Sequence, residues 1–320
     1  MIAASSGSLN IVGKAAPALM DFTGSFGAFC KVLRPNSKVH PGYFANFFKT
    51  RDYRRRISAL AAGVNINNLR NEHLDELEIP LPPLEEQRRI AEVLDRAEEL
   101  RSKRREAIAL LDTLTQAIFL EMFGAPNSNH QNYLKLPLSE LCAIDSPLVD
   151  PTLPEYENLF HIGPDRIERN TGKLLPAKTA KQDGLTSVKF RFKSDCILYS
   201  KIRPYLNKVA LATESGLCSA DMYPVTVRSE IAVREFIWYL LLSDDFLKYA
   251  ATLSNRSNIP KINRKQFLAY PAICPPLKLQ KQFANRVTAI ENLKTAHRAS
   301  LSELDALFAS LQHRAFRGEL

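Results

Sequence analysis

Two clusters of basic and amide side chains are the parts of this 320-residue sequence whose residue types and spacing suit binding chemistry. The first cluster lies within residues 178–208, and the second is the run from Asn255 to Lys265. Lysine and arginine neutralise phosphates, and affinity grows with the number of phosphates neutralised because each contact releases counterions. The clustering, together with a net charge of +9, therefore indicates a polyanionic partner.

The first cluster contains an alternating stretch in which Lys189, Arg191 and Lys193 are separated by Phe190 and Phe192. Successive side chains of a β-strand point to opposite faces, so we expect the charges on one face and the rings in the core. A basic strand face can lie along a nucleic acid, although an ordinary solvated sheet face gives the same pattern. The other candidates for nucleic-acid contacts in this cluster are Lys178, Lys181, Lys201, Arg203, Asn207 and Lys208.

Arg203 and Asn207 are of the types that pair bidentately with guanine and adenine edges, whereas Lys201 and Lys208 suit phosphates. An arginine that bonds nearby carbonyls is an equal alternative for Arg203. The second cluster is polar, basic and interrupted by a proline, which predicts a loop followed by the start of a helix. Such loops are usual reading elements, although ordinary turn chemistry also accounts for the Asn and Ser residues. Its candidate contacts are Arg256, Asn258, Lys261 and Arg264.

The sequence contains no pattern typical of a catalytic centre. It has no GxxxxGK[ST] loop, no glycine-rich loop suited to a methyl donor, and no histidines paired at metal-ligand spacing. The five cysteines are scattered and lack a CxxC spacing, which favours reduced thiols in a cytosolic protein. We therefore expect a non-catalytic chain that holds no metal and no cofactor.

An internal repeat organises the chain. At an offset of 193 residues, Pro82, Pro83, Leu84 and Gln87 fall on Pro275, Pro276, Leu277 and Gln280. The same offset aligns hydrophobic positions upstream, such as Val32 with Val225, and aligns Leu111-Asp112 with Leu304-Asp305 downstream. A period of this length indicates duplicated domains rather than a solenoid.

Each repeat closes with a long helical pattern. Apolar residues recur every three or four positions after Pro83 until Gly124, and again after Pro276 until about Gly318. The first helix would be on the order of 55–60 Å long at ~1.5 Å per residue, and the sustained spacing favours a coiled-coil seam. Arg104 and His297 occupy equivalent seam positions. They are either side chains at the edge of the seam or polar residues that set the register between the helices.

The region between the helical patterns predicts a mixed α/β domain, with strands near 187–192, 196–199, 208–212 and 223–227 and a helix at 235–242. The first copy of this domain lacks a counterpart of residues 131–194. We expect a partial first domain at 1–80, a helix at 81–124, a second domain at 125–275 and a second helix at 276–320.

The run Leu81 to Ile90, the segment Asp195 to Ala210 and the ending Leu311 to Leu320 together resemble the specificity (S) subunits of type I restriction-modification enzymes. The resemblance covers essentially the whole chain. It implies a mixed α/β (α+β) fold in which two target-recognition domains, the first partial, are joined by two long antiparallel coiled-coil helices. It also implies a non-catalytic subunit that binds double-stranded DNA at a bipartite site.

The implied partners are two modification (methyltransferase) subunits that use S-adenosylmethionine, and restriction subunits that use ATP and Mg²⁺. Self-association is possible for a chain with one incomplete domain. Two other hypotheses remain open from the sequence. One is a truncated S-subunit that acts as an assembly or regulatory scaffold with impaired DNA reading, and the other is an unrelated coiled-coil DNA-binding regulator.

Overall fold

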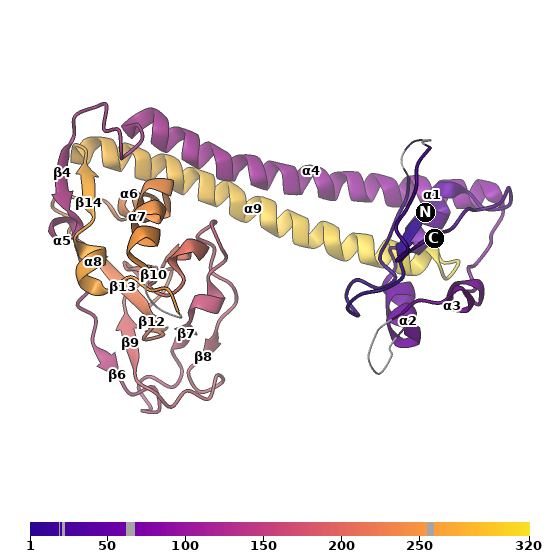
Figure 1. Ribbon diagram of the computed structural model, residues 1–320, viewed down its shortest axis with the longest axis horizontal. Helices are drawn as coiled ribbons and strands as arrows, with labels where there is room; N and C mark the ends of the chain where they lie inside the picture. Colours follow the sequence, from indigo (N-terminus) through magenta and orange to yellow (C-terminus); the bar gives the residue numbers. More distant parts are fainter. Residues whose placement is uncertain (19, 21–22, 62–67, 255–258) are drawn as a thin grey trace. The chain divides into compact units, whose positions relative to one another are not determined.

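The computed structural model describes residues 1–320 apart from 19, 21, 22, 62–67 and 255–258 (Figure 1). The chain divides into two compact units. Unit 1 comprises Met1–Ala109 and Thr295–Leu320, and unit 2 comprises Leu110–Lys294. Two long helices, α4 (Leu84–Phe123) and α9 (Leu277–Ala315), each contribute to both units, and they confirm the two long helices predicted from the hydrophobic spacing.

Unit 1 contains a small antiparallel sheet of order β2-β1-β3 and three short helices. Its elements are β1 (Ile2–Ala4), β2 (Ala15–Ala16), β3 (Cys30–Val32), α1 (Pro41–Phe47), α2 (Arg51–Ala61) and α3 (Asn71–Asp75). Helix α1 begins with a proline, which has no N–H to lose at that position. Helix α2 buries Tyr53, Ile57 and Ala61, which share one face because they are spaced four residues apart.

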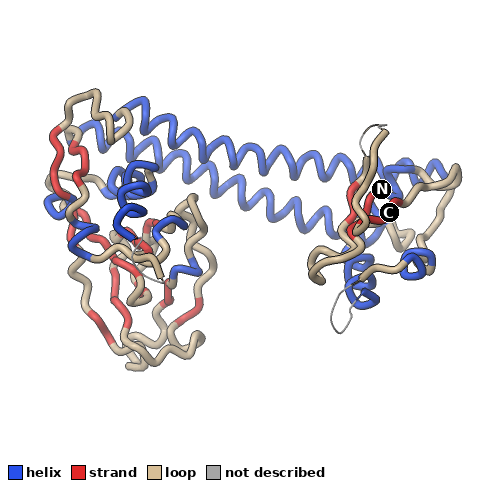
Figure 2. Tube along the Cα trace, in the orientation of Figure 1, coloured by secondary structure: helices blue, strands red, loops and turns tan. Residues whose placement is uncertain are grey.

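The strands of unit 2 are drawn red in Figure 2. Among the described residues they form sheets of order β11-β10-β13-β5, β6-β9-β12-β7-β8 and β14-β4. All the paired strands are antiparallel except β12 and β7. The strands are β4 (Leu134–Pro137), β5 (Cys142–Ala143), β6 (Leu148–Val149), β7 (Phe160–Ile162), β8 (Lys178–Thr179), β9 (Lys189–Phe192), β10 (Ile197–Ser200), β11 (Val209–Leu211), β12 (Gly216–Cys218), β13 (Met222–Val227) and β14 (Pro271–Cys274). The helices that lie within the unit are α5 (Leu138–Leu141), η1 (Pro164–Arg166), η2 (Pro204–Leu206), α6 (Arg234–Leu242), α7 (Asp244–Ser254) and α8 (Arg264–Leu268).

The two units share a core topology, as the sequence repeat predicts. The order β2-β1-β3 in unit 1 matches β11-β10-β13 in unit 2. In both units the sheet is followed by two consecutive helices, a short helix and then a long one. The starts of α3 and α8 are separated by the repeat offset of 193 residues, and so are the starts of α4 and α9. The five-stranded sheet of unit 2 has no counterpart among the described residues of unit 1.

Helices α4 and α9 lie alongside each other and run antiparallel within each unit. In unit 1, Ile90 and Leu94 of α4 are buried with Phe308 of α9, and Arg101 of α4 pairs with Asp305 of α9 at 2.6 Å. In unit 2, Phe119 and Phe123 of α4 pack against Phe283 of α9, with ring centroids 5.5 Å apart in both pairs. The coiled-coil character of the pairing stays a prediction.

A buried glutamine explains why the repeated motif carries Gln at this position. The Gln87 Nε2 group donates to the carbonyls of Pro82 and Lys38, and its Oε1 accepts from His40 N at 2.8 Å. Gln280 makes the same three hydrogen bonds, with Pro275, Ile231 and Val233. All three partner positions repeat at the offset of 193 residues. Each glutamine therefore ties the first turn of a long helix to the segment that precedes α1 or α6.

Candidate nucleic-acid interface

The β10–β11 connection is a tight loop built around η2. Two non-glycine residues with left-handed backbone flank that turn, Arg203 (φ 47°) and Asn207 (φ 47°). A left-handed conformation is uncommon for arginine, so the surrounding contacts must hold the loop in place. One such contact is the hydrogen bond from Arg203 N to Pro260 O at 2.7 Å.

This loop lies beside the second basic cluster. Ile202 forms a β-bridge with Lys261, and Ile262 N donates to Lys201 O at 3.0 Å. The following residue, Asn263, caps α8 because its Oδ1 accepts from Gln266 N at 2.9 Å. The fold thus joins the two clusters through residues that are 59 positions apart in the sequence. We call residues 201–208 together with 259–265 the two-loop surface.

The exposed cations of the two-loop surface are Arg203, Lys261, Arg264 and Lys265. The Arg203 guanidinium has no hydrogen bond or ion pair with any described residue, and Tyr205 beside it is half exposed. Burial raises the pKa of the Tyr223 hydroxyl beneath the loops, and the positive charge of Arg264 opposes that shift. The arrangement offers several cations and an aromatic ring to one partner, which suits a nucleic-acid backbone with adjoining bases.

Three of the predicted contacts in the first loop are instead occupied within the protein. The Lys201 Nζ group donates to Ala220 O at 2.6 Å, and Lys208 Nζ donates to Pro164 O at 2.6 Å. Asn207 is buried, with its Nδ2 donating to Leu242 O at 2.9 Å. The structure therefore gives Asn207 a role in fixing the loop, where the sequence suggested an adenine contact.

The predicted basic face of strand β9 needs a correction at Lys189. Arg191 and Lys193 are exposed and Phe192 is buried, as the alternation predicts. Lys189, however, is only 7% exposed, and its Nζ group donates to the carbonyl and hydroxyl of Ser187. Because the acceptors belong to a residue two positions earlier, the Lys189 ammonium group has two hydrogen-bond partners within the protein. Arg191 stacks over the Tyr156 ring at 5.8 Å.

The cations near strand β8 stand among acidic groups. Lys178 is exposed on β8, and Lys181 pairs with Glu157 at 3.3 Å. Nearby, Asp183 accepts from His161 Nδ1 at 3.2 Å. The acidic partners reduce the positive field that a phosphate would meet here. Two further candidates, Arg256 and Asn258, lie outside the described residues.

Tyr205 and Lys265 were not among the contacts predicted from the sequence. Lys265 ends the basic run Asn255 to Lys265, and Tyr205 lies in the segment Asp195 to Ala210 that resembles the family. These positions in the sequence could have identified both residues. Among the described residues, no group of three or more His, Cys, Asp and Glu side chains could hold a metal ion. No helix in the described part of the chain is long and apolar enough to cross a membrane.

Duplicated α/β modules on long helices, with paired basic loops on one module, define a DNA-recognition protein built from repeats. The family model for the type I restriction modification DNA specificity domain matches residues 4–110 and 137–305. The chain is 28% identical to the type I restriction enzyme EcoDI specificity subunit of Escherichia coli, across 97% of this chain and 77% of that protein.

Solved structures give the same fold. The S subunit of a type I restriction-modification system from M. genitalium superposes with a TM-score of 0.58 at 18% identity, covering 98% of this chain and 82% of that one. A structure described as the basis of complex assembly and conformational transition of the type I R-M system gives a TM-score of 0.53 at 20% identity, covering 92% of this chain and 75% of that one.

The chain belongs to the type I restriction modification DNA specificity family. It is a specificity subunit, the non-catalytic DNA-recognition component of a type I restriction-modification system.

Proposed function

We propose that this subunit directs its complex to a bipartite DNA site and that unit 2 reads one half of the site through the two-loop surface. The observation that carries the proposal is the bridge between Ile202 and Lys261, which brings the segments of the exposed Arg203 and Lys261 side by side. Arginine pairs bidentately with guanine, and the neighbouring lysines suit the phosphates on either side.

Exposed leucines of α4 and α9, one pair in each unit, are the proposed contacts for modification subunits. Leu100 of α4 and Leu293 of α9 are equivalent in the repeat and are 41% and 52% exposed, and the equivalent Leu114 and Leu307 are 44% and 49% exposed. The repeat keeps a large apolar side chain exposed at both pairs of positions, and we infer that a partner covers them. One solved structure of this fold concerns complex assembly of the type I R-M system, which supports an association of this chain with partner subunits.

The chemistry would then reside in the partners. We infer that this chain carries no cofactor, that the two modification subunits bind S-adenosylmethionine, and that restriction subunits supply ATP- and Mg²⁺-dependent steps. The complex would act on chromosomal or incoming DNA in the cytoplasm.

One observation favours a second candidate, an assembly or regulatory scaffold with impaired reading of one half-site. Unit 1 has the same bridge as the two-loop surface, between Ser6 and Asn68. At the positions equivalent to Lys261, Arg264 and Lys265, however, it has Asn68, Asn71 and Glu72. Unit 1 thus lacks, at these three positions, the cations with which unit 2 would bind DNA.

A binding-site selection separates the candidates. The chain would be co-purified with its modification subunit and used to select duplexes from a random pool, followed by footprinting. Sequence reading by both units predicts a two-part footprint, and a scaffold predicts a complex without one. Selective binding by the chain without its partner would instead favour a regulator.

Arg203→Ala tests the reading surface in the same assay. Loss of a bidentate base contact would reduce discrimination at one half-site by roughly ten- to a hundredfold, about 1–3 kcal/mol. Arg228→Ala, which removes an exposed arginine of unit 2 outside the two-loop surface, is the matched control and should leave discrimination unchanged. Equal behaviour of the two variants would remove Arg203 from the reading surface.

A further inference from the structure

Unit 1 contains a cleft of about 630 Å³ between helix α2 and the C-terminal end of α9. Cationic side chains dominate its rim, with Asp52 and Glu78 as the acidic members. We call this cavity the α2 cleft. The basic residues that line it are Arg51, Arg55, Arg56, His313 and Arg317.

Arg51 and Arg317 are the cations of the α2 cleft that are most available to a ligand, because Arg56 NH2 donates to Glu76 O at 3.0 Å. The side chains of Arg51 and Arg317 make no hydrogen bond or ion pair with any described residue, and both are exposed. The Arg55 side chain is 82% exposed and its 3.6 Å pair with Asp52 is solvated, so the contact is weak. Arg54 differs, because its guanidinium donates to Val12 O at 2.6 Å and holds α2 against the loop that follows β1.

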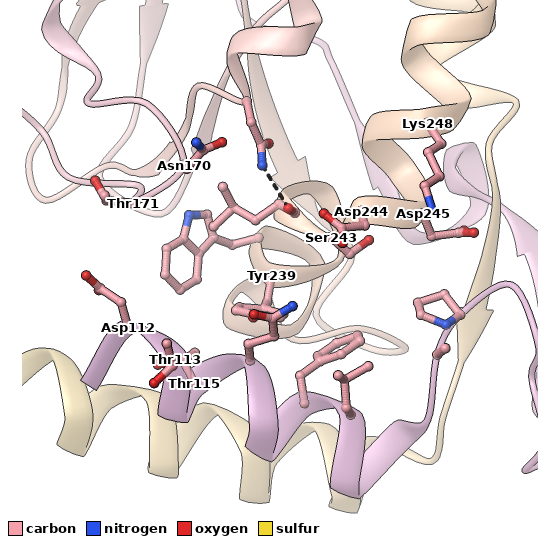
Figure 3. Close-up of a pocket in the computed structure, with 18 of the residues that line it drawn as sticks. Asp112, Thr113, Thr115, Asn170, Thr171, Tyr239, Ser243, Asp244, Asp245 and Lys248 are labelled. Atoms are coloured by element: carbon pink, nitrogen blue, oxygen red, sulfur yellow. Dashed lines mark hydrogen bonds between the residues drawn. The ribbon is translucent and has the colours of Figure 1, made fainter. Parts of the chain in front are cut away.

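The equivalent cleft of unit 2 has the opposite character (Figure 3). This cleft of about 560 Å³ is lined by Asp112, Asp244 and Asp245, by the exposed Lys248, and by the buried Lys294, which pairs with Asp112. Along the repeat, Arg51 corresponds to Asp244 and Arg56 to Tyr249, whereas Arg55 and Lys248 keep their charge. A phosphate would be repelled from the unit 2 cleft and attracted to the α2 cleft.

The two units therefore place their cations on different equivalent elements. Helix α2 carries four arginines and one aspartate, whereas α7 carries two aspartates and one lysine. Residues 259–265, which lead into α8, carry three cations, whereas the matching residues 66–72 of unit 1 carry Arg70 offset by Glu72. Unit 1 thus lacks positive charge where unit 2 would read bases, and has it on the neighbouring helix.

We propose that the α2 cleft binds phosphates of double-stranded DNA, so that unit 1 adds affinity for the duplex that does not depend on the base sequence. Arginine forks match phosphate geometry, and a cleft lined by one sign of charge focuses the field on a polyanion. Contacts of this kind raise affinity for all sequences alike. The inference rests on the proposed DNA binding of the complex.

The test exchanges the cleft residues for those of unit 2. The double variant Arg51→Asp/Arg56→Tyr would be compared with Arg34→Asp/Lys38→Tyr, which makes the same charge change at exposed positions of unit 1 outside the cleft. Affinities of the complex with modification subunits would be measured for a selected and a random duplex, between about 50 and 200 mM salt.

Loss of two phosphate contacts should reduce the slope of log K against log salt concentration by about 2. The affinity of the complex for each of the two duplexes should fall by roughly tenfold or more at low salt. The ratio of the two affinities should not change, and the control should follow the wild type. Arg51→Gln/Arg317→Gln, a milder pair, should show the same trend if the first variant folds poorly.

A cleft variant with the slope and affinity of the control overturns the inference, and so does a loss of sequence discrimination. A variant that binds DNA more weakly only because it binds the modification subunit more weakly also overturns the inference. In that case the cleft would bind an acidic surface of the modification subunit. Competition by inorganic phosphate alone, with DNA affinity unchanged in the variants, would assign the cleft to a small anion instead. A wild-type complex that binds no duplex would remove the proposed function itself, an outcome distinct from all of these.

Discussion

Units 1 and 2 keep the same internal contacts and differ in the charges that they expose. Both hold the start of a long helix through a buried glutamine with three equivalent hydrogen bonds. Both keep one strand order ahead of the following helices, β2-β1-β3 in unit 1 and β11-β10-β13 in unit 2. Their exposed cations lie on different elements, α2 in one unit and the loop into α8 in the other. The duplicated scaffold is therefore separable from the surface that meets a partner.

An ion cluster on the helix pair extends the internal likeness. In unit 1, Arg101 pairs with Glu98 and with Asp305. In unit 2, Lys294 occupies the equivalent position and pairs with Glu291 at 2.6 Å and Asp112 at 2.7 Å, which are also equivalent residues. The units differ in burial, since the Lys294 side chain is 4% exposed and the Arg101 side chain 17%. The charged contact is retained, but it costs more desolvation in unit 2.

The largest expected effect concerns the buried glutamines. Gln280→Leu would leave the N–H of Val233 and the carbonyls of Ile231 and Pro275 without their partner, and should lower the free energy of unfolding by about 3 kcal/mol. Gln87→Leu should cost a similar amount if the two units are equivalent in their scaffold. Urea unfolding with hydrogen exchange resolved by unit would measure both changes.

Gln282→Leu is the control for this comparison, because Gln282 is exposed on the same helix two residues away. It should change the free energy of unfolding by no more than about 0.5 kcal/mol, as surface substitutions usually do. A large effect for one buried glutamine and none for the other would break the equivalence of the scaffolds.

A smaller effect is expected at the ion clusters. Lys294→Met removes the cation shared by Asp112 and Glu291, and should cost about 1–2 kcal/mol, because both carboxylates are about one third exposed and can be solvated in part. Arg101→Met should cost less, about 1 kcal/mol or below, since its site is wetter. Thermal unfolding in low and high salt would measure the difference. An Arg101→Met effect that exceeds the Lys294→Met effect would contradict the ranking by burial.

The scaffold could be predicted from the sequence because its signals are local or periodic. The apolar spacing after Pro83 and Pro276 gave both long helices, and Gly124 ends the first with a left-handed backbone (φ 71°). The repeat offset predicted that the two modules share a core. These features depend on the spacing of residues along one element, which a single sequence displays.

The candidate site could be predicted only in part, because its contacts join distant residues. The sequence identified both basic clusters, but nothing in it shows that Ile202 bridges Lys261. Asn207 looked available for a base until the structure placed its amide on Leu242 O, which lies 35 positions away. Lys189 fitted the alternating pattern, yet its ammonium group bonds to Ser187. Residue type indicates which contacts are possible, and the fold decides which are already occupied.

The smallest effect is expected at the contact between two residues that are equivalent in the repeat. Arg104 and His297 are equivalent residues, and Arg104 NH1 lies 2.7 Å from His297 Nδ1 within unit 1. Arginine can only donate, so His297 accepts through Nδ1. This contact supports the hypothesis that polar seam residues set the helix register. His297→Leu should cost only about 0.5–1 kcal/mol, because the Arg104 guanidinium is partly exposed.

The double variant Arg104→Leu/His297→Leu separates register from stability. It should unfold within about 1 kcal/mol of the wild type, since apolar replacement of both partners is often neutral. If the pair sets the register, spin labels at the exposed positions Lys103 and Ala296 should show an added distance population, shifted by about one helical turn of 5.4 Å. An unchanged single distance would mean that the Arg101–Asp305 ion pair and the packing of Phe308 already fix the register, and that Arg104 and His297 only border the seam.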